Sequence, residues 1–159
     1  MIRLHFSLGT DWTSRVIAWF SAGDFSHVDA ILPDGSLLGS RSDAIGGKPP
    51  GVQIRPAGYE PWRAWAIVEL AANPVQESAF HGFLLRQIGK PYDSRAIWGF
   101  ITGRDWRAQD SWICSELQAA ALEGSAVIPP LFFEANKITP AALALAVSAA
   151  GGKITSHYP

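Results

Sequence analysis

Segments with the periodicity of a β-strand fill the first half of this chain, and helical patterns fill most of the second half. Residues 2–8 alternate apolar and polar side chains, as a half-buried strand does. The Asp34-Gly35 pair tolerates the positive φ of a tight turn and therefore predicts a β-hairpin. Strands are expected at residues 2–8, 27–32, 36–40, 52–55 and 64–70. Because strands and helices are segregated along the chain, we expect an α+β fold with an antiparallel sheet packed against helices.

Helices are expected where apolar residues recur at helical spacing behind a capping residue. Pro74 suits the first position of one helix, and Thr139-Pro140 opens an alanine-rich helix near the end of the chain. The expected helices run from 11 to 21, from 74 to about 88, from 94 to about 102, from 114 to 124, and from 140 to the Gly151-Gly152 pair. The residues after this pair are expected to form a frayed tail.

The composition is that of one folded domain over residues 1–159. It is 48% hydrophobic and 17% charged, which allows a sizeable core. With a formal net charge of -1, the chain lacks the excess of positive charge that binds nucleic acid, so we exclude nucleic acid as a partner. No segment has the pattern of a secretory signal or of a spanning helix, so we expect a protein without a membrane anchor that is cytoplasmic as synthesised. The oligomeric state stays open.

Cys114 is the single cysteine, so it can form neither an internal disulfide nor a thiolate-rich zinc site. A lone cysteine is often a small buried apolar residue. Cys114, however, stands where the polar loop 103–111 gives way to an alanine-rich helix. The N–H groups at the start of a helix favour a thiolate and can hold an oxyanion. Two interpretations follow, a residue of the core or a nucleophile.

His27 stands at the start of an apolar strand, where an imidazole can be both accessible and rigidly held, as a general base requires. A lone histidine is also often structural. The other histidines are assigned no role: His5, His81 and His157. We expect no cofactor and no metal, because no second histidine or cysteine stands at ligand spacing from His27.

Three segments occur in a characteristic order: Ser26-His27-Val28 before the hairpin turn, Gly89-Lys90-Pro91-Tyr92-Asp93 after a helix, and Ile113-Cys114-Ser115-Glu116-Leu117 at a helix start. Together they resemble the circularly permuted branch of the NlpC-type cell-wall peptidases, which belong to the papain-like superfamily. In papain-like enzymes of ordinary order the cysteine helix precedes the histidine strand. Here the histidine comes first, as in the permuted branch.

The resemblance implies a circularly permuted papain-like fold and a cysteine peptidase or amidase. Cys114 would attack a carbonyl group, His27 would accept and return the proton, and Tyr92 would line the substrate cleft. The implied substrate is a small peptide or amide of the bacterial cell wall, reached through phage machinery or a secretion system, or else an intracellular one. Two alternatives stay open: acyl transfer or ester hydrolysis on lipids, as in lecithin:retinol acyltransferase relatives, and a non-catalytic binding or structural module.

The resemblance places a third polar group, which orients the imidazole, on the strand after the histidine. This position falls on Gly39, which has no side chain. The sequence therefore predicts a Cys114–His27 dyad whose orienting partner is unassigned.

Hairpin register decides what could replace this partner, because a slip of one residue exchanges the two faces of a strand. With a two-residue turn, Ser40 and Ser42 share the face of the histidine. With a turn one residue longer, Gly39 and Arg41 take those places. Asp29 shares the face in both registers, but we expect two positions along a strand to be too far for a direct bond. A backbone carbonyl or a water are the remaining alternatives.

Overall fold

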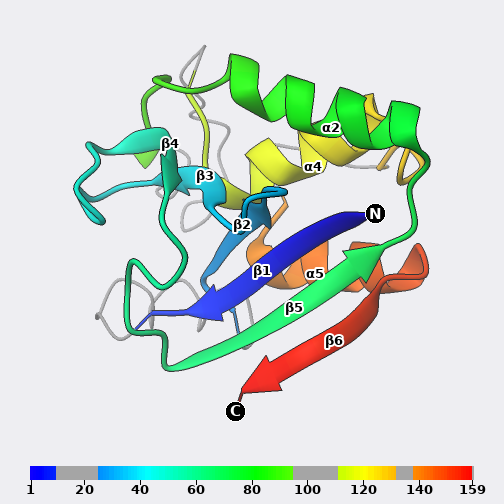
Figure 1. The fold of residues 1–159 in the computed structure, drawn as a ribbon, viewed down its shortest axis with the longest axis horizontal. Coiled ribbons are helices and arrows are strands. Elements are labelled where there is room, and N and C mark those ends of the chain that lie inside the picture. Colours follow the sequence, from blue (N-terminus) through cyan, green and yellow to red (C-terminus); the bar gives the residue numbers. More distant parts are fainter. Residues whose placement is uncertain (10–24, 95–110, 132–137, 159) are drawn as a thin grey trace.

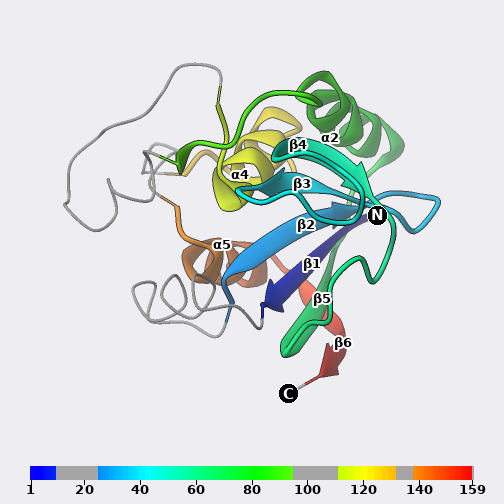
Figure 2. The ribbon, with the colours of Figure 1, turned by 90° about the vertical axis from the view of Figure 1, so that its left-hand side faces the viewer.

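The computed structural model describes residues 1–9, 25–94, 111–131 and 138–158, and it confirms the α+β class. Six strands form one antiparallel sheet in the order β4-β3-β2-β1-β5-β6, which can be followed in Figure 2. The strands are β1 (Ile2–Leu8), β2 (His27–Ile31), β3 (Leu37–Arg41), β4 (Gly51–Arg55), β5 (Ala64–Leu70) and β6 (Lys153–Tyr158). The helices are α2 (Pro74–Arg86), α4 (Cys114–Gly124) and α5 (Pro140–Ala149).

The first five strands begin and end within one residue of the predicted positions, and capping side chains explain the starts of α2 and α5. Asn73 caps α2 in a capping box with Gln76, and the side chain of Thr139 accepts a hydrogen bond at the start of α5. The expected helix at 11–21, and the one at 94–102 apart from its first residue, lie outside the described residues.

The C-terminal tail is not frayed, so that expectation was wrong. Residues 153–158 form β6, which pairs with β5 at the edge of the sheet. The outer edge of β5 offers unpaired N–H and C=O groups, and the tail satisfies them. This strand depends on a partner distant in sequence, which is why its own residues did not reveal it.

The β2–β3 hairpin adopts the longer of the two turns considered above. Ala30 pairs with Leu38, and Ile31 pairs with Leu37. Continued along the strands, this register sets Gly39 opposite Asp29 and Arg41 opposite the first residue of β2.

The core lies between the sheet and α4, which packs on β2 and β3 with α2 beside it (Figure 1). Its fully buried apolar residues include Leu4, Phe6, Val28, Leu38, Leu117 and Leu122. Each such side chain contributes roughly 1.5–3 kcal/mol on burial. Among the described helices, none has the length and hydrophobicity to cross a membrane.

Two polar contacts fix the start of α4 relative to β3. The hydroxyl of Ser40 donates to the carbonyl oxygen of Trp112 at 2.7 Å, and the amide of Gln118 donates to the carbonyl oxygen of Leu38 at 3.0 Å. Both donors are fully buried, so these bonds form without competition from bulk water. They hold the first turn of α4, and with it Cys114, beside the hairpin.

Candidate active site

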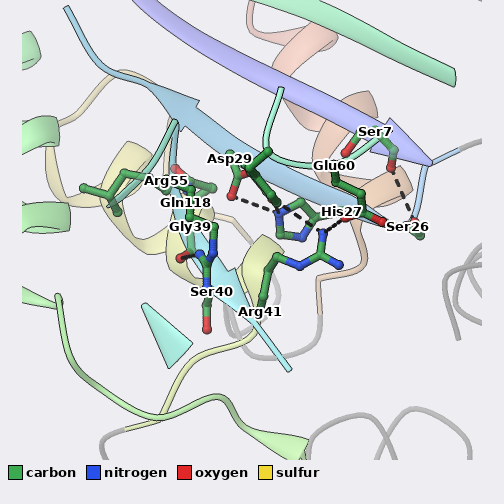
Figure 3. Close-up of polar contacts among 12 residues, drawn as sticks. Ser7, Ser26, His27, Asp29, Gly39, Ser40, Arg41, Arg55, Glu60 and Gln118 are labelled. Atoms are coloured by element: carbon green, nitrogen blue, oxygen red, sulfur yellow. Dashed lines mark hydrogen bonds and ion pairs between the residues drawn. The ribbon is translucent and has the colours of Figure 1, made fainter. Parts of the chain in front are cut away.

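His27 and Asp29 lie on the same face of β2 and are in direct contact. The distance between His27 Nε2 and Asp29 Oδ1 is 2.9 Å (Figure 3). The expectation that two positions along a strand are too far apart was wrong. Alternate residues share a face, and strand side chains lean along the strand, so an imidazole ring can reach the next carboxylate. Both side chains are buried, with 1% of Asp29 exposed.

Gly39 is the reason why this carboxylate fits. A Cβ atom added to Gly39 would lie 1.8 Å from Asp29 Oδ1 and 2.9 Å from Asp29 Cγ. The position that the resemblance assigned to a third polar group is therefore space that the side chain of Asp29 fills. The polar partner of His27 comes from its own strand and not from the next one.

The two serines considered as partners do not contact the imidazole. Ser40 is engaged with Trp112, as described above. Ser42 lies beyond the end of β3 and is exposed. The longer hairpin turn explains this result, because it moves both serines off the face of His27.

Cys114 is the first residue of α4, and 5% of it is exposed. Ile113 precedes it in extended conformation and provides no side-chain cap, so no side chain of this residue covers the first N–H groups of the helix. Cys114 lies close enough to His27 to help raise the pKa of its imidazole. The structure thus brings the two predicted residues together.

Electrostatics favour an ion pair at the centre of this site. Burial alone would lower the pKa of His27, but the charge and hydrogen bond of Asp29, with a smaller contribution from Cys114, raise it to about 9. Burial alone would raise the pKa of Asp29, yet His27 and the hydroxyl of Tyr59 hold it below its ordinary value. At neutral pH, His27 is therefore an imidazolium beside a carboxylate.

Tyr92, the predicted substrate-binding residue, lies close to the cysteine. It forms a parallel bridge with Trp112, two residues before the start of α4, and it is half-buried. Burial and the nearby Cys114 raise the pKa of its hydroxyl. A phenol in this position stays protonated and can therefore act as a hydrogen-bond donor.

Two aromatic residues that the sequence did not single out complete the surroundings of His27, and both come from the β4–β5 loop. The hydroxyl of Tyr59 donates to Asp29 Oδ2 at 2.9 Å and lies 3.3 Å from His27 Nε2. Trp62 stacks on the imidazole, with ring centroids 6.0 Å apart and an interplanar angle of 14°. Loop residues show no periodicity, so no sequence signal marked these two.

Arg41 lies on the same face of the sheet as His27, and neighbouring carboxylates neutralise its positive charge (Figure 3). Its guanidinium forms ion pairs with Glu60 and with Asp43, the latter at 2.7 Å. It also lies 5.6 Å from the ring centroid of Tyr59 and 5.7 Å from that of Trp62. The β4–β5 loop is thereby tied to β3 over the His27–Asp29 pair. Within the described ranges, no group of three or more His, Cys, Asp or Glu side chains is placed to hold a metal ion.

Comparisons with known proteins establish a likeness of fold. No family model matches the sequence, and no curated protein matches it. Among solved structures, the chain is similar to the crystal structure of the metalloprotein yiiX from Escherichia coli O157:H7, a DUF1105 protein, with a TM-score of 0.57 and 16% identity. The match covers 78% of this chain and 64% of the length of that protein. At this identity the likeness concerns the fold alone.

Proposed function

We propose that this protein is a thiol hydrolase with a circularly permuted papain-like fold, in which Cys114 is the nucleophile, His27 the general base and Asp29 the group that orients the imidazole. One observation carries the proposal: the buried ring of His27 lies 2.9 Å from Asp29 Oδ1 through Nε2 and also interacts with Cys114. A nucleophile, a base and an orienting group that contact one another in this order form the catalytic arrangement used in acyl transfer.

In the proposed reaction, His27 has already taken the thiol proton and is an imidazolium, and the thiolate sulfur of Cys114 attacks the carbonyl carbon of an amide. The N–H groups at the start of α4 stabilise the oxyanion. The C–N bond then breaks, His27 gives its proton to the leaving amine, and a thioester remains. Water attacks this thioester as it loses a proton to the now neutral His27, and the sulfur departs as a thiolate beside the restored imidazolium. Asp29 stabilises the imidazolium in both halves of the cycle.

The resemblance to permuted NlpC-type peptidases supplies the substrate class, which is a small peptide amide of the cell-wall type. Tyr92 supports an acyl-binding role, because it lies beside Cys114 with a protonated hydroxyl.

Alkylation of Cys114 by iodoacetamide, followed by mass spectrometry over a pH series, tests the nucleophile. We expect modification of the folded protein at neutral pH, and a fall of roughly tenfold or more in rate for His27→Ala, since a thiolate requires the neighbouring cation. The same reaction in guanidinium chloride gives the intrinsic reactivity of the thiol. Labelling that occurs only in the unfolded protein would overturn the proposal and favour a non-catalytic module.

A substrate panel tests the reaction class. Peptidoglycan stem peptides, simple amides and fatty-acid esters are compared with the wild-type protein and with Cys114→Ala. Turnover of amides that Cys114→Ala abolishes supports the proposal, whereas turnover of esters alone favours the lipid alternative. Because the structural neighbour is titled a metalloprotein, the panel is repeated after dialysis against EDTA. A loss of activity that a divalent metal restores would contradict a purely thiol mechanism.

A further inference from the structure

The carboxylate of Asp29 has a polar neighbour at each of its oxygens, an ion-pair partner at one and a hydrogen-bond donor at the other. Oδ1 faces His27 Nε2 at 2.9 Å, and Oδ2 accepts the hydroxyl proton of Tyr59 at 2.9 Å. Asp29 is 1% exposed, so bulk water does not replace either contact. A carboxylate with one partner can rotate about its two side-chain bonds, whereas two partners on opposite oxygens fix its plane.

Tyr59 is itself fixed from several sides. Its ring meets the edge of Trp62 at 5.3 Å between centroids, with an interplanar angle of 84°. The guanidinium groups of Arg41 and Arg55 lie 5.6 and 5.7 Å from its centroid. Arg55 is anchored to β3 by a bond to the carbonyl oxygen of Gly39 at 3.2 Å. The hydroxyl is therefore aimed at Asp29 by the packing around it.

The other neighbours of Asp29 do not take this role. His5 lies directly across from it on β1, but its imidazole is packed against Trp62 and Trp65, and Nδ1 has no hydrogen-bond partner among the described residues. Gly39 has no side chain. The hydroxyl of Tyr59 is what the described structure offers to Oδ2.

We propose that Tyr59 is a positioning residue, whose hydroxyl orients the Asp29 carboxylate so that Oδ1 faces His27 and the imidazole is held toward Cys114. It acts on the Nε2 side of the imidazole, through Asp29 and through its own contact with Nε2 at 3.3 Å. Its importance for catalysis rests on the proposed function, but its effect on His27 does not.

Replacement of Tyr59 by phenylalanine removes the hydroxyl and keeps the ring contacts. Two effects on His27 then oppose each other. Loss of a donor leaves the charge of Asp29 less dispersed, which would raise the pKa of His27. Loss of orientation lets the carboxylate turn away from Nε2, which would lower it. A fall in the pKa of His27 therefore indicates that Tyr59 positions the pair. A rise indicates that Tyr59 only disperses the negative charge of Asp29.

NMR titration of the imidazole resonances measures this direction, with the signal of His27 assigned from His27→Gln. For Tyr59→Phe we expect the pKa of His27 to fall from about 9 toward the ordinary 6.5, to a value below about 8. Alkylation of Cys114 should slow by roughly threefold to tenfold at pH 7. An unchanged or higher pKa in Tyr59→Phe would overturn the proposal.

Matched variants keep the experiment interpretable. Asp29→Asn removes the charge of the carboxylate and so gives the largest fall in the pKa of His27 that Tyr59→Phe could produce. Ser125→Ala removes a buried hydroxyl at the far end of α4, where it bonds to the carbonyl oxygen of Ala121 at 2.8 Å, and should leave the titration of His27 unchanged. Should Tyr59→Phe fail to fold, Tyr59→Met fills the same space without a donor and is judged by the same criterion.

The two proposals fail in different ways. If the pKa of His27 falls in Tyr59→Phe but Cys114 does not react when folded, Tyr59 positions the pair and the hydrolase proposal is wrong. If Cys114 reacts and depends on His27, while Tyr59→Phe leaves the titration unchanged, the hydrolase proposal stands and the role of Tyr59 is wrong.

Discussion

The carboxylate of Asp29 on β2 occupies the place that a side chain of residue 39 on β3 would fill, because a Cβ atom on Gly39 would lie 1.8 Å from Asp29 Oδ1. If this position is expected to carry a polar side chain, Gly39 leaves the catalytic arrangement one group short. In the folded sheet, the missing side chain leaves the space that the Asp29 carboxylate occupies. A group that orients His27 is therefore present, and it is supplied by the strand that carries the histidine.

This complementarity predicts strong coupling between the two positions. In Gly39→Ala, the new methyl group must displace the carboxylate, and we expect a loss of about 1–3 kcal/mol in the free energy of unfolding. In an Asp29→Ala background the same change should cost less by about 1 kcal/mol or more, because the obstructing carboxylate is gone. Urea unfolding of the two single variants and the double variant measures the coupling. Additive effects would mean that the two side chains do not compete for one space.

The raised pKa of His27 predicts how stability depends on pH. Its pKa is about 9 in the folded protein and 6.5 in the unfolded chain. The stabilisation from the protonated ring is thus complete below pH 6.5 and is lost as pH rises through 9, since the folded state binds more protons in this window. The difference corresponds to about 3 kcal/mol.

Asp29→Asn is the control for this prediction, since it removes the charge that outweighs the burial of His27. Unfolding in urea at several pH values between 6 and 10 should show a decline for the wild-type protein that is much smaller in Asp29→Asn. Groups that titrate elsewhere in the chain affect both proteins alike. Parallel curves for the two would show that the pair is not coupled.

Ser40→Ala is expected to separate a structural serine from an orienting one. The hydroxyl of Ser40 is bonded to the carbonyl oxygen of Trp112, which also accepts the backbone N–H of Asp93, so its removal costs one hydrogen bond, about 0.5–1.5 kcal/mol. The NMR titration of His27 should not change. A fall of its pKa in Ser40→Ala, comparable to that in Asp29→Asn, would show that Ser40 also orients the ring.

The sequence by itself determined what depends on neighbours along the chain. Alternation of apolar residues predicted the first five strands, and the capping residues Asn73 and Thr139 marked two helix starts, because both signals act over a few residues. The start of α4 at Cys114 and the position of His27 at the end of a strand were predicted in the same way. Cys114 and His27 were thereby marked as candidates, and Tyr92 was added by the resemblance of its segment to a known family.

Only the tertiary structure decided what depends on register and on distant partners. The length of the hairpin turn moved Ser40 and Ser42 off the face of His27 and set Gly39 opposite Asp29. The β6 strand required the free edge of β5. Tyr59 reaches Asp29 from a loop whose residues carry no periodic pattern. A shift of one residue exchanges the faces of a strand, so these contacts are settled when the sheet assembles and not before.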